Sequence, residues 1–491
     1  MAYNNVIVEG DLDLRGLNLT RVSLDISLKE MYPSLPDYGI LITSPIIITN
    51  SVVNGSVYMN GTAFQNITFF DGTKFKGAVF LTLSKFNKSA GFSKAQFSQT
   101  ADFSAAQFNQ TADFLAAQFN QTADFSAAQF HKGPIFFSSH WFLQFIEIEV
   151  SFTYMVNFKE AKFNKTADFA EAKFNQIADF SKAQFNQTTD FSATQFDQTS
   201  DFWGSKFNQT ANFWGSKFNQ TADFSNVQFN QTANFWDSRF NQTANFWGSK
   251  FNQTADFSGV QFNQESYFED AGFFHVSFKN SQFSKEAFFD GAQINGTLSL
   301  YRTKYDTLNI RWLSIHDLAY DDTAYHLLIQ NFNKLGFGDD ARECQYSYRC
   351  KHREELFRQH KFDSWLFDLL AYATYGYGLR PVRPLGWAAF FIFIGGVFFF
   401  LTGSVARSKE RPSEKRPLAL RKREEKPEGS ASIWESLLLS ATYFTSGASS
   451  IISATHTEFV PIGRGRYVVV ILRLLGWIFF VLFLSSLTRT V

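Results

Sequence analysis

The sequence has little of what marks a secreted, a metal-binding or a nucleic-acid-binding protein. Its 491 residues include two cysteines, Cys344 and Cys350, which lie six apart on a predicted helix and so point to different faces. They are not expected to bind a metal together, and two unpaired cysteines are typical of a reducing compartment. The formal net charge is zero, so charge gives no indication of a nucleic-acid partner.

Signals for export and for catalysis are also missing. The opening residues, MAYNNVIVEGDLDL, have no basic stretch followed by an apolar run, so no cleaved signal peptide is expected. No group of His, Asp and Glu in the repeated region has the spacing of a catalytic or metal site. The chain is therefore not expected to be an enzyme, and no cofactor is expected.

What is abundant is phenylalanine, with 62 residues, far more than an ordinary core uses. Positions 101–111 read ADFSAAQFNQT, and close copies follow, so the phenylalanines belong to a repeat. Their steps alternate between five and six, so one repeat unit holds two phenylalanines. From Phe64 to Phe273, every eleventh residue is Phe except Trp141.

One stretch, 131–151, is unlike the repeat, and we interpret it as two degenerate units rather than an insertion. Phe130 and Phe152 are two repeat units apart, and Phe136 and Trp141 keep the phase. The register is therefore expected to run unbroken through this stretch.

A small residue precedes most of the phenylalanines by two positions, as at Ala101, Ala106, Ala112 and Ala117. This pattern resembles the A(D/N)(L/F)XX motif of the pentapeptide-repeat family. The resemblance implies a β-solenoid, a right-handed quadrilateral β-helix in which four pentapeptides make one coil. In that family the small residue and the central residue both point inward.

The chain departs from the motif by one extra residue, typically the Thr of NQT, in every second pentapeptide. A 22-residue coil with four inward phenylalanines follows if the square coil is kept, and Phe103 then stacks on Phe125. The alternative is a flat solenoid with an 11-residue coil, in which Phe103 stacks on Phe114. In either case each coil buries its aromatic layer only against its neighbours.

Two kinds of surface residue recur in the repeat. Asn-X-Thr sequences are interpreted as corner residues that hydrogen-bond along the stack, with glycosylation as the other interpretation, at Asn109, Asn120, Asn208 and Asn219. A row of tryptophans follows inward phenylalanines and is expected to point outward, at Trp203, Trp214, Trp236 and Trp247. The row is a candidate contact surface; the other interpretation is duplication of a FWGSK unit without selection on Trp.

The chain divides into four predicted regions. We expect an N-terminal cap at 1–60, in which the apolar stretch 40–53 covers the first coil. The solenoid follows at 61–297, then a connector at 298–384 and a membrane domain at 385–491.

The connector is predicted to contain a helical hairpin at 321–357, turning at Gly336–Gly338. Its helices are expected to begin at Asp322 or Thr323 and at Asp339 or Asp340. An amphipathic helix suited to the membrane surface follows, with Trp365, Leu366, Leu369, Leu370 and Tyr372.

The motif TYGYG at 374–378 is similar to the potassium filter sequence TVGYG. We do not interpret it as a filter, because it precedes the first predicted span whereas a filter lies between spans. Together with Pro381 and Pro384, its glycines are interpreted as a break that turns the chain into the bilayer.

Two apolar segments predict a multi-pass protein of the cell membrane, in contact with membrane lipid. Positions 385–406 contain no charge and positions 467–487 contain only Arg473. At about 1.5 Å per residue each can cross ~30 Å of hydrocarbon. Between them lie a basic loop at 407–429 and a stretch at 430–466, predicted as a short pore helix and a re-entrant loop. Ser432 and Glu435 are expected to form a capping box at the start of that helix.

The order of span, short helix, small-residue loop and span resembles the two-helix, potassium-channel-like pore domain. SIWESLLLSATYFTSG is similar to a pore helix that enters a filter, and FVPIGRGRYVVVILRLLGW to the stretch that leads into the inner helix. The resemblance implies a homotetramer, an inner-helix hinge at Gly476, and a pore segment of Thr445, Ser446, Gly447, Ala448 and Ser449. TVGYG is absent between the spans, so the permeant ion is left open.

Arg473 is an intramembrane charge and is expected to face the bundle interior or a neighbouring subunit, with Glu435 or Glu458 as partner. The channel resemblance and the missing signal peptide place the solenoid in the cytoplasm. The nine Lys and Arg residues of loop 407–429 favour the opposite orientation.

Two functions are compatible with these patterns. The first is an oligomeric, ion-channel-like membrane protein with a cytoplasmic solenoid as sensor, vestibule or spacer. The second is a membrane-tethered scaffold whose solenoid binds a protein partner. The re-entrant loop separates them, since a plain anchor needs no capped half-helix between its spans.

Overall fold

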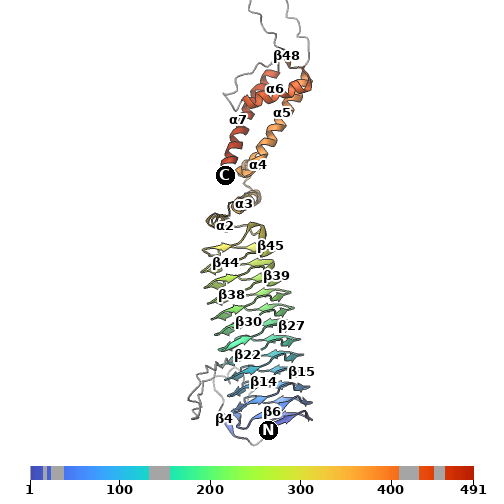
Figure 1. Cartoon of the computed structure of the whole chain (residues 1–491), viewed down its shortest axis with the longest axis vertical. Helices are drawn as coiled ribbons and strands as arrows, with labels where there is room; N and C mark the ends of the chain where they lie inside the picture. Colours follow the sequence, from blue (N-terminus) through green and yellow to red (C-terminus); the bar gives the residue numbers. More distant parts are fainter. Residues whose placement is uncertain are drawn as a thin grey trace, which may run out of the picture. The chain divides into compact units, whose positions relative to one another are not determined.

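The computed structural model describes residues 2–14, 19–23, 38–131, 155–407, 431–446 and 459–490 (Figure 1). The chain divides into two compact units. We call Met1–Ala341 the solenoid unit and Arg342–Val491 the helical unit.

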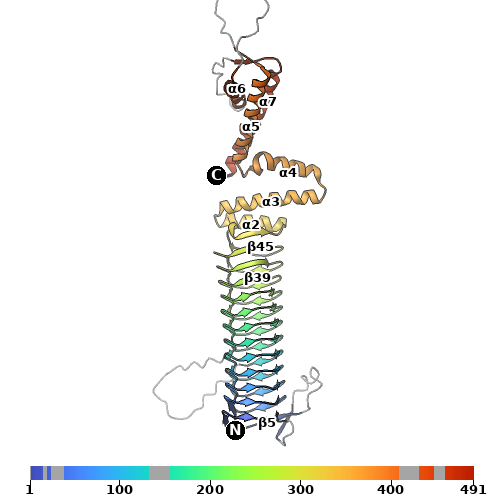
Figure 2. The same cartoon turned by 90° about the vertical axis from the view of Figure 1, so that its right-hand side faces the viewer.

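The solenoid unit is a stack of four-sided coils built from short parallel strands (Figure 2). The strands of one coil are β16 (Ala101–Asp102), β17 (Gln107–Phe108), β18 (Ala112–Asp113) and β19 (Gln118–Phe119). β16 pairs in parallel with β20 (Ala123–Asp124), so that Ala101 lies beside Ala123, two repeat units later. Among the described residues, the four sides join into sheets of 13, 12 and 22 strands, the largest of which covers two sides. The 22-residue coil is confirmed.

Four columns of phenylalanine fill the interior. Phe103 stacks on Phe125 of the next coil, with ring centroids 4.8 Å apart and planes at 1°. Phe114, half a coil away, instead meets Phe103 edge to face, at 5.4 Å and 90°. The alanines two residues before are buried as well, which lets the large rings approach the axis. Burial contributes roughly 1.5–3 kcal/mol per phenylalanine, and each ring pair adds about 0.5–1.5 kcal/mol. The 11-residue coil is therefore wrong.

Tight turns form two diagonally opposite corners of each coil, at the five-residue spacings. In the turn after β16, the Ala106 N–H donates to the Phe103 carbonyl at 3.0 Å, and Ala105 has a φ of 52°. The Asp102 carboxylate accepts the Ser104 N–H at 2.9 Å and so holds the turn from outside. Glycine occupies the left-handed position in the FWGS units, which removes the strain that alanine bears there.

The ladder of described strands does not run through the unlike stretch 131–151, so the prediction of an unbroken register is wrong. Ala112 pairs with Val156 and Gln129 with Lys173, a separation of four repeat units instead of two. The coils on either side therefore pair directly with each other. Positions 132–154, with Phe136, Trp141 and Phe152, lie outside the described residues. Because the extra length equals one coil, it leaves the phase of the phenylalanines unchanged.

The ladder begins earlier than the predicted boundary at residue 60. The first strands are β1 (Ala2–Asn4), β2 (Ile7–Val8) and β3 (Leu12–Asp13). They pair with β6 (Ile46–Thr49), β7 (Val52–Val53) and β8 (Val57–Tyr58). β4 (Arg21–Ser23) and β5 (Tyr38–Ile42) form an antiparallel hairpin, and β5 continues into the parallel ladder. The segment predicted as a cap thus contributes strands to the solenoid.

At its other end the solenoid extends beyond residue 297. Ser266 pairs with Ala287, so the coil becomes one residue shorter there. Three longer strands run through one corner, namely β39 (Lys250–Asp256), β42 (Gly272–Ser277) and β45 (Gln293–Ser299). The last strands are β46 (Leu308–Asn309) and β47 (Ile315–Leu318), with a 3-10 turn, η1 (Trp312–Ser314), between them.

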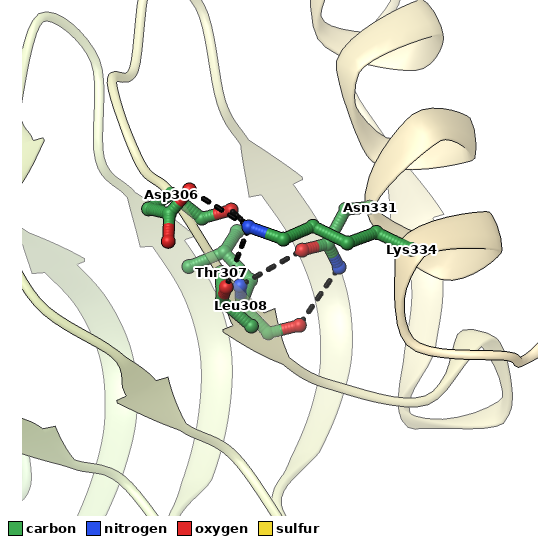
Figure 3. A network of polar contacts seen from close by, with 5 residues as sticks. All are labelled: Asp306, Thr307, Leu308, Asn331 and Lys334. Atoms are coloured by element: carbon green, nitrogen blue, oxygen red, sulfur yellow. Dashed lines mark hydrogen bonds and ion pairs between the residues drawn. The ribbon is translucent and has the colours of Figure 1, made fainter.

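Helix α2 (Asp322–Lys334) covers the end of the stack. Its capping residue is Asp321, one residue before the predicted caps, and the Asp321 carboxylate accepts the Ala324 N–H at 2.8 Å. The Asn331 side chain accepts the Leu308 N–H at 2.9 Å and donates to the Leu308 carbonyl at 2.8 Å (Figure 3). Asn331 therefore takes the place of the next strand and satisfies the edge of β46.

The helical unit contains the remaining elements. They are α3 (Gly338–Arg358), α4 (Phe362–Tyr375), η2 (Gly376–Gly378), α5 (Val382–Thr402), β48 (Val405–Arg407), α6 (Ile433–Ser446), β49 (Phe459–Pro461) and α7 (Gly465–Thr490). α2 and α3 are the two helices expected within 321–357, and α3 begins at Gly338, before the predicted caps at Asp339 or Asp340. α5 and α7 run side by side in opposite directions and α6 packs against both (Figure 1). β48 and β49 pair antiparallel where α5 ends and α7 begins.

Candidate functional site

Two helices in the described part of the chain are long and apolar enough to cross a membrane. They are Val382–Thr402, with 21 residues, and Gly465–Thr488, with 24. At about 1.5 Å per residue both reach the ~30 Å of a hydrocarbon layer. By length and composition they correspond to the predicted spans 385–406 and 467–487, each beginning two or three residues earlier.

The short helix α6 packs closely between these two helices because glycines face it. A Cβ on Gly395 of α5 would lie 2.4 Å from Ser440 Oγ, and one on Gly396 would lie 2.8 Å from Leu437 Cα. On α7, a Cβ on Gly476 would lie 1.8 Å from the Phe444 carbonyl oxygen. Gly476, predicted as a hinge, thus lies within the continuous α7 at a contact that only glycine permits.

α6 begins at the predicted capping box. The Ser432 N–H donates to the Glu435 carboxylate at 2.7 Å, and the Glu435 N–H donates to Ser432 Oγ at 3.3 Å. These reciprocal bonds satisfy two amides that the first turn of a helix leaves open.

The end of α6 differs from the prediction that the loop starts at Thr445. Thr445 Oγ1 donates to the Ala441 carbonyl at 2.9 Å, and Ser446 Oγ donates to the Tyr443 carbonyl at 2.9 Å. Both residues belong to the last helical turn, because α6 continues through Ser446. The other predicted pore residues, Gly447, Ala448 and Ser449, lie outside the described residues.

Arg473 lies on α7 with its guanidinium over the ring of Tyr443 of α6, 5.3 Å from the centroid. Its side chain remains exposed in the single chain, rather than inside the bundle. Of the two predicted partners, Glu458 lies outside the described residues. An exposed arginine in an otherwise apolar helix calls for water, a lipid headgroup or another subunit.

The surface of the three helices is apolar. Large side chains are exposed on each of them, including Phe393, Leu401, Trp434, Leu438, Leu474 and Trp477. The buried contacts between the helices are also apolar, with Phe399, Leu439, Leu472 and Phe479 at their centre. Helices that are apolar both inside and outside are suited to lipid or to contact with further copies.

On the solenoid, the four tryptophans lie at corner turns and their exposed fractions are between 41% and 48%. They form two groups instead of the single predicted row. Trp214 and Trp236 lie on one corner of neighbouring coils, with ring centroids 6.2 Å apart. Trp203 and Trp247 lie half a coil away, on the opposite corner, and Lys182 Nζ is 5.1 Å from the Trp203 ring.

The asparagines of the NQT corners form hydrogen-bonded ladders along the stack. Asn109 donates to Asn87 at 2.8 Å, and Asn208 donates to Asn186 at 2.7 Å. Asn120 accepts from Asn164 at 2.8 Å, and Asn219 donates to Asp197 at 2.6 Å. All four predicted sequence sites therefore use their amides within the fold, which favours the corner-residue interpretation over glycosylation.

The repeat also matches a known family model, described as pentapeptide repeats (9 copies). The matched segments overlap and cover 70–118, 81–129, 149–195, 169–217 and 202–250. The chain contains pentapeptide repeats. A comparison with curated proteins gives no match. All matched segments fall in the solenoid unit, whose pentapeptide repeats carry the extra residue that lengthens each coil.

A polar cluster that the sequence did not predict lies beside the TYGYG segment, where η2 connects α4 to α5. The Tyr377 hydroxyl donates to the Asp368 carboxylate at 2.6 Å and accepts from Arg353 at 2.9 Å. Burial, together with the bond to Asp368, raises the pKa of Tyr377. Arg380 binds both carboxylate oxygens of Glu343 at 2.7 Å.

Backbone conformation sets this cluster apart from a filter. Gly376, Tyr377 and Gly378 have φ values of 58°, 61° and 79°, so the chain turns sharply there. The interpretation of TYGYG as a glycine-rich break agrees with this turn. The sequence signals this polar cluster only through its many Tyr and Arg residues, and these do not specify which side chains pair.

Proposed function

We propose that the protein is an oligomeric, ion-channel-like membrane protein whose pentapeptide-repeat solenoid lies outside the bilayer. The observation that carries the proposal is α6, a capped helix of 14 residues held between two helices of spanning length. At about 1.5 Å per residue α6 reaches only ~21 Å, too short to cross. In the bilayer, the chain must therefore return after α6 to the side of the membrane from which it entered. A non-helical backbone within the hydrocarbon layer requires a water-filled cavity or surrounding protein.

Arg473 supports an assembly of several copies. It is exposed on α7 in one chain, where contact with lipid at the helix centre would cost about 2.5–3.5 kcal/mol. A ring of identical subunits turns this side chain toward a neighbour or toward water. The number four comes from the resemblance to two-helix channels, as does the cytoplasmic placement of the solenoid as sensor, vestibule or spacer.

The second candidate is a membrane-tethered scaffold. The exposed pair Trp214 and Trp236 favours it, because adjacent tryptophans on a corner offer a flat apolar contact. In this case α5 and α7 only anchor the solenoid, and no ion path is needed.

Ion currents separate the two candidates. The purified full chain in planar bilayers is expected to give currents with a reversal potential that shifts with the ion gradient. Ser449→Cys, in a background with Cys344→Ala and Cys350→Ala, is expected to make the current sensitive to water-soluble thiol reagents. Trp214→Ala serves as the matched control and is expected to leave the current unchanged. A silent protein whose mass in detergent is that of one chain, 56.1 kDa, would favour the scaffold.

A further inference from the structure

Helix α4 carries an apolar face that remains at least half-exposed in the described chain, although the Phe362 ring meets the Phe357 ring edge to face, with centroids 5.8 Å apart. Its exposed side chains are Phe362, Leu366, Phe367 and Leu370, with exposed fractions of 51%, 51%, 74% and 52%. Leu366, Phe367 and Leu370 follow Phe362 by four, five and eight positions, so all four side chains lie on one side of the helix. Asp363 also falls on this side, in the first turn next to the exposed Lys361.

The other side of α4 is fixed to the beginning of α5. Trp387 Nε1 donates to the Ala373 carbonyl at 2.8 Å, and the Tyr377 hydroxyl donates to Asp368 at 2.6 Å. Arg383 donates to the Tyr372 carbonyl. Figure 2 shows α4 lying across the direction of α5 rather than continuing it. α4 also contacts α7, so it lies near the beginning of α5 and the end of α7.

The residues around α4 and the beginning of α5 have a composition typical of the boundary between membrane and water. Exposed basic residues precede α4 directly, at Arg358, which also pairs with Glu355 at 3.9 Å, and at Lys361. Trp365 lies on α4 itself and Trp387 just inside α5. Tryptophan and tyrosine gather where hydrocarbon meets water, and clustered basic side chains attract anionic headgroups.

We infer that α4 is an interfacial helix that lies on an anionic lipid surface, with Phe362, Leu366, Phe367 and Leu370 in the boundary between headgroups and acyl chains. Exposed apolar side chains of this size are stabilised there by burial, while the bonds to α5 hold the helix parallel to the surface. The inference rests on the membrane insertion of the proposed function and needs no pore.

Spin labels on the full chain in lipid nanodiscs test this placement. Leu366→Cys, Phe367→Cys and Leu370→Cys are made singly in the Cys344→Ala, Cys350→Ala background, and each carries a nitroxide. Phe393→Cys on α5 is the reference for lipid, and Ser364→Cys, on the other side of α4, is the reference for water. In phosphatidylglycerol discs the three α4 labels are expected to collide more with oxygen than with a water-soluble nickel complex, as the Phe393 label does. The Ser364 label is expected to show the opposite preference.

Each other outcome decides a different point. If the Phe393 label lies in lipid while the α4 labels lie in water, the interfacial helix is wrong and the membrane insertion stands. If the Phe393 label also lies in water, both are wrong. If the α4 labels are shielded from both reagents, protein covers this face and the lipid surface is wrong. In phosphatidylcholine discs the ratio of oxygen to nickel collisions at Phe367 is expected to fall, and an unchanged ratio would overturn the role of anionic lipid.

Discussion

At the scale of the residue, the outside of the solenoid is as regular as its interior, but its regularity costs stability. Asp201 lies between Asp179 and Asp223 on neighbouring strands of one side. Its carboxylate accepts the Trp203 N–H at 2.8 Å and so fixes the corner turn. Partial burial, reinforced by the two neighbouring carboxylates, raises the pKa of Asp201 above its ordinary 3.8. The turn thus gains a hydrogen bond while the column accumulates like charges.

Asp201→Asn is therefore expected to stabilise the protein. At the equivalent position, Asn212 still accepts the Trp214 N–H, at 3.2 Å, and also donates to Asp190 at 3.0 Å. Removing a like-charge contact between neighbouring strands is worth roughly 0.2–1 kcal/mol. Chemical unfolding of the full chain in detergent, followed by far-ultraviolet circular dichroism, measures the gain.

The pH dependence of this gain has a definite sign. Because the pKa of Asp201 is higher in the folded state, its charge destabilises the fold once pH rises above the unfolded value of 3.8 and through the folded value. The advantage of Asn is expected to be full at pH 7, to shrink as pH falls through the folded value, and to be lost below the unfolded value of 3.8. Asp201→Ala, which loses the acceptor, is the control and is expected to destabilise. An equal gain from Asn at both pH values would contradict the charge explanation.

At the scale of the element, the end of the solenoid depends on one side chain of α2. Asn331→Ala would leave the buried Leu308 N–H without its acceptor and the Leu308 carbonyl with only the Ile310 N–H (Figure 3). The expected loss is about 1–3 kcal/mol, together with a greater tendency to aggregate through the uncovered strand edge. Unfolding curves and light scattering measure the two effects. Lys334→Ala on the same helix removes an exposed ion pair with Asp306 and is expected to cost much less, because water screens both partners. Equal stability of the two variants would rule out Asn331 as the end cap.

Elements defined by neighbouring residues could be predicted, and those defined by distant ones could not. The resemblance to pentapeptide repeats implies the four-sided coil, while the spacing of Phe103, Phe108 and Phe114 alone leaves the 11-residue coil open, and the capping box needs only Ser432 and Glu435. The bond between Asn331 and Leu308 joins distant positions and depends on how the last coil meets α2. The pairing of Arg380 with Glu343 depends in the same way on how α3 meets η2. The helical conformation of Thr445 and Ser446 was not predicted, because small polar residues suit both a last helical turn and a loop.

At the scale of the whole molecule, periodicity concealed the insertion between the two halves of the solenoid. Phe130 stacks on Phe174 at 4.7 Å, although four repeat units separate them. Counting phenylalanines cannot distinguish an extra coil from an excursion of the same length, because both preserve the phase. Strand pairing does distinguish them, since it joins Ala123 directly to Ala167.

Deleting 132–139 tests this difference, because eight residues, which are not a whole number of repeat units, can be removed from an insertion but not from a continuous ladder. If the chain between β21 (Gln129–Phe130) and β22 (Met155–Asn157) adds no coil, a shorter connection still lets Ala112 pair with Val156. The loss of stability is then expected to be small, since loop length changes the closure entropy by only about 0.6 kcal/mol per doubling. Deleting 208–215, a segment of the same length, is the matched control: it moves every later phenylalanine eight positions out of its column and is expected to abolish cooperative unfolding. Equal damage from both deletions, measured by circular dichroism and limited proteolysis, would restore the continuous register, because only a ladder that runs through 131–151 makes the two segments equivalent.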